Sequence, residues 1–490
     1  MLELTLAEVA GAVGGTLHDA DPDTVVTGSV EYDSRRVTPG GLFLALPGER
    51  VDGHEYAARA VEQGVAAVLC TRPVPAPRIE VADGIAALTA LAGTVARRLD
   101  AAVIGITGSS GKTSTKDLLA AVLASAGPTV AAVGSANNEL GHPYTVLRAD
   151  ADTRFLVLEL GARGIGHIRH LAEIAPPGIG VVLNVGTAHL GEFGTREVIA
   201  QAKGELVEAL PVDGVAVLNA DDPLVAAMAA RTSAGVVTFG SSERADVRGT
   251  GVRLDDLGRP AFTLHAGGTD VPVQLRLVGA HHVSNALAAV AVALAVGMSV
   301  EQAAAAVEAS VAASRWRMEL TERADGVVVI NDAYNANPES MRAALDALVA
   351  VTGSRRAKYP QARSFAVLGQ MAELGPAEAA EHEAIGRLAA QLSLARVIAV
   401  GAPARPIEQA AALEGSWDGE ASWVPDATAA ESVLRNELRP GDVVLVKASR
   451  AASLERVGMA IAEDRPGSAV DDSAADGSRR GGDAWASRRS

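Results

Sequence analysis

Thr107-Gly108-Ser109-Ser110-Gly111-Lys112-Thr113-Ser114-Thr115-Lys116 is the stretch that decides the fold of this chain. An apolar run precedes it and a helical pattern follows it, which predicts a strand, a glycine-rich turn and the start of a helix. In such a turn backbone N–H groups surround an anion, Lys112 adds a charge for the outer phosphates, and Thr113 offers a hydroxyl to a magnesium ion. The spacing is that of a shortened phosphate loop, because Ile106 stands where the longer pattern has a glycine. We therefore predict that residues Thr107 to Thr113 bind the phosphates of ATP.

The composition limits the class of protein. A length of 490 residues exceeds what one core usually organises, which predicts about three domains. The formal charge of −16 disfavours a nucleic-acid partner. The one cysteine, Cys70, ends an apolar run, which predicts a reducing compartment and a buried, unreactive thiol. Because the N-terminus lacks a basic and apolar leader and no run of about 18 apolar residues occurs, we expect a cytoplasmic protein that does not insert into a membrane.

Strand-like and helix-like segments alternate over most of the chain, which predicts an α/β fold of parallel sheets covered by helices. We expect an N-terminal domain over residues 1–99, a central phosphate-loop ATPase domain with a parallel sheet over 100–313, and a Rossmann-like C-terminal domain over 314–464. From residue 465 onward glycine, serine, aspartate and arginine dominate without periodicity. Such a segment cannot bury enough apolar surface to offset its ordering entropy, so a disordered tail is predicted over 465–490.

Hydrophobic periodicity predicts the helices and strands within each domain. In the first domain they are a helix near 6–13, strands near 25–32 and 42–46, and a helix over 56–63. In the central domain they are strands over 103–107, 130–133, 155–160, 180–185, 215–219 and 236–239, an antiparallel patch between 247 and 277, and helices near 283–296 and 299–312. In the last domain they are strands over 327–330, 365–368, 397–400 and 443–446, each followed by a helical stretch.

Polar residues follow two of the predicted central strands. Glu159 ends an apolar run, and ligands in open parallel sheets bind at the carboxyl ends of strands, so we expect it to share a magnesium ion with Thr113 and the phosphates. His189 follows the next strand in the same way. From the residues alone, a metal ligand and a structural histidine are about equally good interpretations of His189. Lys203 lies in a helical pattern, where a solvent-facing lysine is the default.

A series of short motifs runs along the chain in order. They are Thr107–Lys116, Asn137–Pro143, Glu159–Ala162, Ala188–Leu190, Ala202–Glu205, Gly279–Ala286 and Asn331–Pro338. Together they resemble the successive signatures of the Mur ligase family, over about residues 1–463. Within that family the runs Asp332–Met341 and Leu368–Gly375 resemble the branch that adds D-alanyl-D-alanine, and the Asp-Asn-Pro-Arg signature of the diaminopimelate-adding branch is absent. His282 stands where the family often has asparagine and Gln370 where aspartate is common, so neither is assigned a role.

The resemblance implies a three-domain enzyme that uses ATP and Mg²⁺ and acts on small molecules. It implies phosphorylation of the terminal carboxylate of a UDP-N-acetylmuramoyl tripeptide, attack of an amine on the acyl phosphate, and release of ADP, in the cytoplasmic stage of peptidoglycan synthesis. Amide formation in water needs an activated carbonyl, and protein groups then act mainly by positioning and by neutralising charge. We expect a monomer.

The resemblance also implies roles for individual residues. The catalytic residues are Lys112, Glu159, His189 and Lys203; the remaining ATP contacts are Asn285, Arg315 and Asp332; the metal ligands are Thr113, Glu159 and His189; and the UDP contacts are Ser34, Arg35 and His54. Lys203 resembles a family lysine that is carbamylated, and a carbamate would face a metal ion. In the third domain we expect Asn337 to cap a helix and, with Asn335, to frame a small pocket for the dipeptide.

Two alternatives stay open. A different ATP-dependent ligase on the same scaffold, such as a diaminopimelate-adding, lysine-adding or folylpolyglutamate-type enzyme, would share the phosphate loop, and only the runs around Asp332 and Gln370 argue against it. A nucleotide-dependent switch would hydrolyse ATP without making a bond, but it would not need a second parallel domain with nucleotide contacts of its own.

Overall fold

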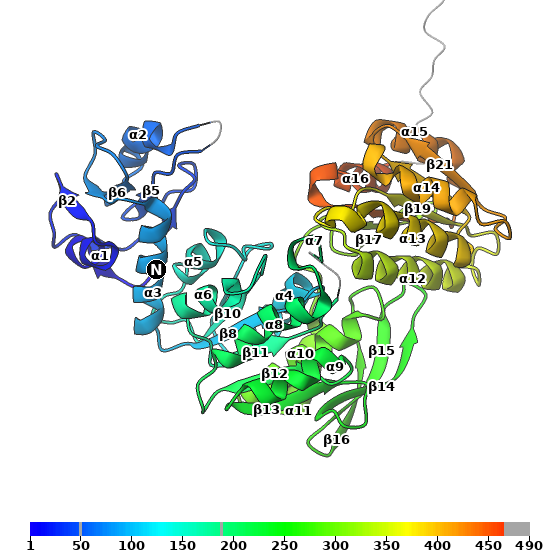
Figure 1. Cartoon of the computed structure of the whole chain (residues 1–490), viewed down its shortest axis with the longest axis horizontal. Coiled ribbons are helices and arrows are strands. Elements are labelled where there is room, and N and C mark those ends of the chain that lie inside the picture. Colours follow the sequence, from blue (N-terminus) through cyan, green and yellow to red (C-terminus); the bar gives the residue numbers. More distant parts are fainter. Residues whose placement is uncertain (49–50, 187–189, 465–490) are drawn as a thin grey trace, which may run out of the picture.

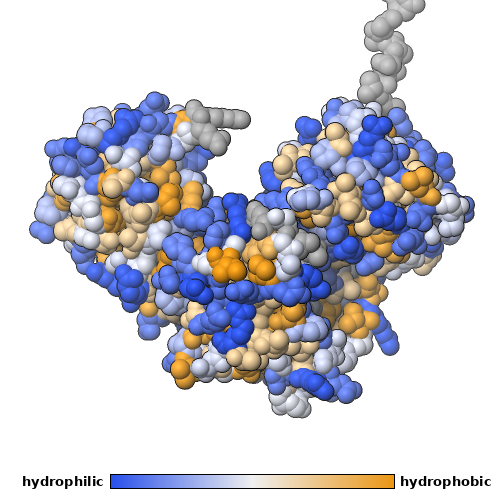
Figure 2. Space-filling model, viewed as in Figure 1, coloured by the Kyte–Doolittle hydropathy of each residue, from blue (hydrophilic) through white to orange (hydrophobic). Residues whose placement is uncertain are grey.

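The computed structural model describes residues 1–48, 51–186 and 190–464, so the predicted tail over 465–490 lies outside the described residues. Figure 1 shows three bodies, with the central one between the N-terminal body on the left and the C-terminal body on the right. Figure 2 shows that the two outer bodies stand apart, with an open hollow between them above the central one. The described strands form four sheets, and none of these sheets mixes strands from two of the bodies.

The N-terminal body contains a small mixed sheet and a two-stranded ribbon. The sheet has the order β2-β7-β6-β5-β4, and β1 pairs with β3. Helix α1 begins with a capping box, in which the side chain of Thr5 accepts the N–H of Glu8 and the Glu8 carboxylate accepts the N–H of Thr5. The elements are β1 (Leu4–Thr5), α1 (Leu6–Val13), β2 (Thr16–His18), β3 (Val25–Val26), β4 (Val30–Glu31), β5 (Leu42–Leu44), η1 (Gly53–Tyr56), α2 (Ala57–Glu62), β6 (Ala67–Cys70), β7 (Arg78–Glu80) and α3 (Gly84–Arg98).

The central body is built on a nine-stranded sheet of order β16-β15-β14-β13-β12-β11-β8-β10-β9. Its strands are parallel from β9 to β14, while β15 and β16 continue the sheet antiparallel. The elements are β8 (Ala102–Thr107), α4 (Lys112–Ala124), β9 (Thr129–Ala131), α5 (Gly141–Val146), β10 (Phe155–Glu159), α6 (His167–Ile174), β11 (Ile179–Val182), α7 (Leu190–Phe193), α8 (Arg196–Glu208), β12 (Val215–Asn219), α9 (Pro223–Ala226), η2 (Ala227–Arg231), β13 (Gly235–Gly240), β14 (Val247–Leu254), β15 (Pro260–Ala266), β16 (Thr269–Gln274), α10 (His282–Ala295) and α11 (Val300–Ala309). The predicted parallel sheet with an antiparallel extension is therefore confirmed.

The C-terminal body has a six-stranded sheet of order β17-β18-β22-β19-β20-β21. Only β17 runs antiparallel to its neighbour. The elements are β17 (Glu319–Glu322), β18 (Val328–Asp332), α12 (Pro338–Arg355), β19 (Ser364–Leu368), η3 (Gly375–Ala377), α13 (Glu378–Gln391), β20 (Arg396–Val400), η4 (Ala402–Ala404), α14 (Arg405–Ala412), β21 (Glu420–Val424), α15 (Ala427–Glu437), β22 (Val443–Lys447), η5 (Arg450–Ala452) and α16 (Glu455–Glu463).

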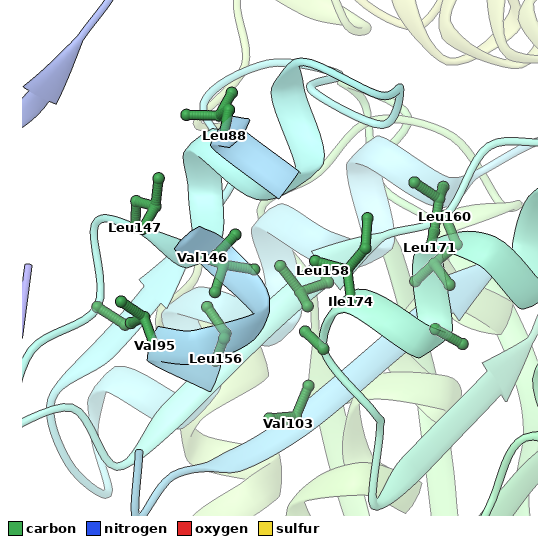
Figure 3. Packing of buried hydrophobic residues seen from close by; sticks show 14 of the residues in the cluster. Leu88, Val95, Val103, Val146, Leu147, Leu156, Leu158, Leu160, Leu171 and Ile174 are labelled. Carbon is green, nitrogen blue, oxygen red and sulfur yellow. The ribbon is translucent and has the colours of Figure 1, made fainter. Parts of the chain in front are cut away.

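Helix α3 connects the N-terminal body to the central sheet through one continuous hydrophobic core. Figure 3 shows Val95 of α3 near Val146 of α5 and Leu156 of β10, with Leu88, from an earlier turn of α3, farther from these three. All four side chains are buried and belong to a single cluster that also includes residues of α1 and of the N-terminal sheet. Burial of apolar area is the dominant favourable term in folding, so α3 fixes these two bodies to each other.

Several expected elements differ from the observed ones. The strand expected over 25–32 is two short strands, β3 and β4, in different sheets. The sequence-based expectations do not include α3, although Asp83 caps its first turn and Arg97 and Arg98 occupy its last, which are ordinary helix signals. They also omit the edge strands β17 and β21, whose residues are largely exposed or half-buried and lack a continuous apolar run.

Two expectations from composition can be compared with the described residues. Cys70 is fully buried at the end of β6, and burial raises the pKa of its thiol, in agreement with an unreactive side chain. Among the described residues no helix combines the length and the apolar character that crossing a bilayer requires.

Candidate active site

The phosphate loop connects β8 to α4 as predicted. Gly111 has φ 79°, a left-handed conformation that suits glycine, and a methyl group added there would lie 3.0 Å from the Oδ1 atom of Asn285. Asn285, on α10, is thus adjacent to the loop, as expected for a nucleotide contact. The Nζ atom of Lys112 donates to the carbonyl of Gly108 at 2.6 Å, so the lysine closes over its own loop.

The base of the loop is held by the chain itself. Asn184, which follows β11, accepts the N–H groups of Ser109 and Ser110 on its Oδ1 atom at 3.0 and 2.9 Å. The buried hydroxyl of Thr107 donates to the carbonyl of Leu160 at 2.9 Å. This fully buried hydroxyl fixes β8 to the end of β10, and the phosphate contact of Thr107 stays a prediction.

Glu159 and Thr113 meet at the edge of the sheet, as the strand-end argument predicts. The Thr113 hydroxyl donates to Oε2 of Glu159 at 3.0 Å, and the Asn137 amide donates to Oε1 at 2.8 Å. A hydroxyl and a carboxylate fit Mg²⁺, which prefers oxygen ligands and completes its shell with phosphates and water. The third predicted ligand, His189, lies outside the described residues, and the described residues hold no cluster of three or more metal-binding side chains.

Lys203 is buried rather than solvent-facing. It lies on α8 and lines the same cleft as Lys112, with 5% of its surface exposed. Burial, with a smaller contribution from the charge of Lys112, lowers the pKa of its amine well below the ordinary value. Among the described residues its amine has no hydrogen-bond or ion-pair partner. The default expectation of a solvent-facing lysine is therefore wrong, and the role that the family resemblance implies for Lys203 stays a prediction.

The C-terminal body reaches the loop with the residues predicted to bind the dipeptide. Asn337 caps α12 by accepting the N–H of Ser340, and its Nδ2 atom lies 3.5 Å from the carbonyl of Ser109. Asn335 lines the same cleft, and its carbonyl accepts the Nζ atom of Lys447. The predicted helix cap is confirmed, and both asparagines face the phosphate loop across the boundary between the two bodies.

The arginine that approaches the phosphate loop is Arg317. Its guanidinium donates to the hydroxyl of Thr113 at 3.3 Å and stacks on the ring of Tyr334 at 4.4 Å. Arg315 is exposed, its guanidinium lies over the ring of Trp316, and it does not line the cleft. The nucleotide contact assigned to Arg315 from the sequence stays a prediction, and the geometry favours Arg317 for that role. The buried Nε atom of Arg317 has no partner among the described residues and is therefore free to bind an acceptor.

Asp332 lies at the end of β18 with both oxygens engaged. Its Oδ2 atom is 2.5 Å from Nζ of Lys447, and its Oδ1 atom accepts the N–H of Met318 at 3.1 Å. A contact with the ribose stays a prediction. Nearby, burial lowers the pKa of His281 to about 4 and that of His282 well below the ordinary value, so both rings are neutral near pH 7.

These groups line one cleft of about 520 Å³ between the central and C-terminal bodies. Most of the residues that the sequence analysis predicts to bind phosphate, metal or dipeptide line this cleft. They are Ser109, Ser110, Gly111, Lys112, Thr113, Glu159, Lys203, Asn335 and Asn337.

Comparison with known proteins agrees with this geometry. Three family models match, described as the Mur ligase family catalytic domain (residues 27–93), the Mur ligase middle domain (106–293) and the Mur ligase glutamate ligase domain (316–450). A UDP-N-acetylmuramoyl-tripeptide–D-alanyl-D-alanine ligase of Mycobacterium tuberculosis is 54% identical over 95% of this chain and 98% of its own length. The chain belongs to the Mur ligase family.

More distant members agree in sequence and in structure. The ligase of the same name from Escherichia coli is 34% identical over 95% of this Mur ligase and 99% of its own length. A crystal structure of MurF from Acinetobacter baumannii has a TM-score of 0.82 and 32% identity, covering 94% and 99% of the two chains. A MurF ligase from Thermotoga maritima in complex with ADP has a TM-score of 0.76 and 30% identity, covering 89% and 97%. The three-domain Mur ligase architecture is therefore shown, and the three bodies are its domains.

The predicted UDP contacts of this Mur ligase lie in the N-terminal domain, away from the cleft. Arg35 is exposed and pairs with Asp33, whose pKa it lowers to about 2. Ser34 is buried beside them. His54 is also buried, with Nδ1 2.6 Å from Asp52 and Nε2 accepting the N–H of Thr71 at 3.1 Å. Both ring nitrogens are thus engaged, which gives His54 a positioning role here, while direct contacts with UDP stay predictions.

Sequence reasoning missed several residues of this Mur ligase site. Asn137 begins one of the family-like motifs and has no predicted role, and Asn184 is predicted only to lie within the strand over 180–185, whereas the observed strand β11 ends at Val182. An asparagine after a buried strand is a usable signal, since the carboxyl edge of a parallel sheet collects ligand contacts. Ser135, whose hydroxyl lies 3.0 Å from that of Tyr334, has no such signal, because the pair forms only when the domains meet.

Proposed function

We propose that this chain is an ATP-dependent, ADP-forming ligase that joins D-alanyl-D-alanine to a UDP-N-acetylmuramoyl tripeptide. The observation that carries the proposal is one cleft lined by the phosphate loop from one domain and by Asn335 and Asn337 from another. A phosphorylated carboxylate and an incoming amine can meet only where both binding surfaces open into the same space. The 54% identical relative bears the name of this activity.

The residues of the cleft suit an acyl-phosphate mechanism. The phosphate loop and Lys112 hold the ATP phosphates, and the carboxylate of the tripeptide attacks the γ-phosphorus while ADP leaves. The amine of the dipeptide then attacks the acyl carbon, loses a proton, and expels inorganic phosphate. Lys112 and Arg317 neutralise the charge that develops on the transferred phosphoryl group, and such preorganised donors are usually the largest catalytic contribution.

Thr113 and Glu159 are the residues that would hold Mg²⁺. Their oxygens lie 3.0 Å apart, one from the phosphate loop and one from the adjacent strand β10. When bound, the ion neutralises phosphate charge and orients the phosphates. Asn137 holds the other oxygen of Glu159 and so fixes the carboxylate for this task.

We also propose that Lys203 is carbamylated. Burial lowers the pKa of this amine well below its ordinary value and so raises the fraction of neutral amine, which is the form that can add to carbon dioxide. The neutral amine forms an N–C bond with carbon dioxide and releases one proton, so a neutral group becomes an anion in a cleft that already holds Lys112. Removal of dissolved carbon dioxide should lower turnover, and bicarbonate should restore it. Lys203→Arg should be nearly inactive with or without bicarbonate, and a fully active arginine variant would contradict this role.

The decisive assay identifies the product. Purified protein is incubated with ATP, Mg²⁺, a UDP-N-acetylmuramoyl tripeptide and one amine at a time, and the products are read by mass spectrometry alongside ADP release. We expect the mass of the pentapeptide product with D-alanyl-D-alanine, and at least about 10²-fold less turnover with diaminopimelate, glutamate or single D-alanine, because an ill-fitting amine leaves buried polar groups unpaired. Equal turnover with one of those amines would show that the protein is a ligase with a different amine specificity. ADP release that needs no amine would show that the protein hydrolyses the nucleotide without forming an amide bond.

The remaining expectations follow from the substrates. Nucleotides and UDP-linked precursors are soluble metabolites, so we propose a cytoplasmic enzyme of peptidoglycan synthesis. We propose separately that it is a monomer. We propose domain boundaries near residues 99/100 and 313/314, between α3 and β8 and between α11 and β17.

A further inference from the structure

The segment that joins the central and C-terminal domains has a strained backbone. In this hinge segment, Ser314–Glu319, Trp316 has φ 58° and Met318 has φ 50°. Both lie in the left-handed region, which costs free energy for residues other than glycine. Six non-glycine residues of the described chain have a positive φ, and two of the six flank Arg317. Strain of this kind persists only where surrounding contacts fix it, and it concentrates at functional sites.

Two carboxylates fix the hinge segment from the C-terminal side. Oε2 of Glu319 accepts the N–H of Trp316 at 3.0 Å, and Oδ1 of Asp332 accepts the N–H of Met318 at 3.1 Å. Asp332 is itself held by the buried amine of Lys447. Each left-handed residue therefore has its N–H bound by a carboxylate, and hydrogen bonds to charged acceptors are about twice as strong as neutral ones.

The other end of the hinge segment is bound to the central domain. The N–H of Ser314 donates to Oδ2 of Asp117 at 3.1 Å, and Asp117 lies on α4, the helix that begins at the phosphate loop. Arg317 lies between the two fixed ends and reaches Thr113. In an extended chain, alternate residues point to the same side, so Arg315 and Arg317 would face one direction. The left-handed conformation of Trp316 breaks that alternation, and only Arg317 faces the loop.

We infer that Glu319 is a positioning residue: with Asp332 it holds the hinge segment left-handed and so aims Arg317 at the phosphate loop. Glu319 does not line the cleft, so it acts through Arg317. Without the carboxylate the N–H of Trp316 loses its partner, and the backbone can relax to negative φ, which turns Arg317 away. This inference rests on the proposed function, because the effect of Arg317 is measured by the rate of ligation.

A double-mutant cycle tests the inference. Glu319→Ala should lower kcat at least tenfold, since a misplacement of about 1 Å at a reacting centre can cost about 10²-fold, while the KM for the UDP-tripeptide changes less than about twofold. Glu319→Gln keeps an acceptor oxygen and should retain most of the activity. In an Arg317→Ala background, Glu319→Ala should lower kcat by less than about a further twofold, because two residues that act as one unit are not additive.

The matched control is Glu322→Ala. Glu322 lies on the same strand, β17, but pairs with Arg355 at 2.8 Å within the C-terminal domain. Its loss should leave kcat within about twofold of the wild type, since it has no link to the hinge segment. Circular dichroism melting checks that each variant folds. If Glu319→Ala does not fold, Glu319→Asp, whose carboxylate is one methylene short of the Trp316 N–H, replaces it in the cycle.

The outcomes separate this inference from the proposed function. If the wild type makes no pentapeptide product, the proposed function fails. If the wild type is active but the Glu319 and Arg317 effects multiply, or Glu319→Gln is as damaging as Glu319→Ala, Glu319 does not act through Arg317 and the inference fails alone.

Discussion

The two junctions between domains differ in chemistry: the first is an apolar core, and the second is mainly polar. At the first, the α3 joint, Leu88 and Val95 of α3 share one buried cluster with the N-terminal sheet and with the central domain. At the second, between the central and C-terminal domains, Ser314 and Arg317 of the hinge segment and Asn337 at the start of α12 make hydrogen bonds to the central domain. Among the described residues, Val278 is the one central residue in a C-terminal hydrophobic cluster. A packed apolar joint resists deformation, whereas a polar interface can be remade, so we expect domain motion at the second junction.

The largest effect should come from opening a cavity in the α3 joint. Leu88→Ala removes a fully buried side chain and should lower the free energy of unfolding by about 3–5 kcal/mol. The folded fraction should keep its kcat, because Leu88 does not line the cleft. Urea unfolding followed by circular dichroism measures the loss, with Leu413→Ala, an exposed leucine, as the control. A loss below about 1 kcal/mol would mean that the joint is not a packed core.

The hinge segment should show the reverse pattern. Arg317→Ala should lower kcat about 10²- to 10³-fold, as expected when one preorganised donor to a developing charge is lost. The melting temperature should change little, since the half-buried guanidinium makes one long hydrogen bond to Thr113 and one stacking contact with Tyr334, each worth about 1 kcal/mol or less. Arg315→Ala is the matched control, because that arginine is exposed two residues earlier, and its kcat should stay within about twofold. Equal losses in the two variants would contradict the assignment of Arg317.

Acid should weaken the α3 joint in particular. His142 lies on α5 and is buried, and burial, opposed by a smaller contribution from the backbone of Leu171, lowers its pKa from 6.5 to about 4. Between these two values the unfolded chain binds more protons than the folded one, so stability is full above about pH 6.5 and falls as pH drops toward 4. From about pH 7 to pH 5 the loss attributable to this group should be about 2 kcal/mol.

The test of this pH dependence is a comparison of melting profiles. His142→Leu, an apolar residue of similar size, should flatten the fall in melting temperature between about pH 7 and pH 5. His18→Leu is the control, since His18 is partly exposed in β2. Parallel profiles for the wild type and His142→Leu would show that His142 does not set the acid response of the joint.

The smallest effect concerns the polar rim of the α3 joint. The Tyr144 hydroxyl donates to the buried carboxylate of Glu31 across the two domains at 2.8 Å, and burial with this bond raises the pKa of Tyr144 to about 12. Tyr144→Phe keeps the packing against Tyr32 and removes one hydrogen bond, which should lower the free energy of unfolding by about 1 kcal/mol. A change as large as that of Leu88→Ala would mean that the polar rim, and not the core, holds the joint.

Local chemistry explains which parts of the site the sequence predicts. Asn337 precedes a proline and has a serine three residues on, so its cap is encoded within four residues. Glu159 ends a buried strand, which places it at the ligand-binding edge of the sheet. Arg317 could not be separated from Arg315, because the direction of each side chain depends on backbone angles, and the N–H of Met318 is bound by Asp332 of β18, which is distant in sequence.

The core that α3 shares between two domains also has a consequence for how the chain folds. Because Leu4 and Leu88 belong to the same buried cluster as Leu156, the N-terminal domain cannot complete its core until β10 has been synthesised. The two domains should therefore form a single cooperative unit, while the C-terminal domain, with buried clusters of its own, folds as a second. A protease should separate the chain near Ser314 into two stable fragments, and a cut near residue 99 should leave neither side folded.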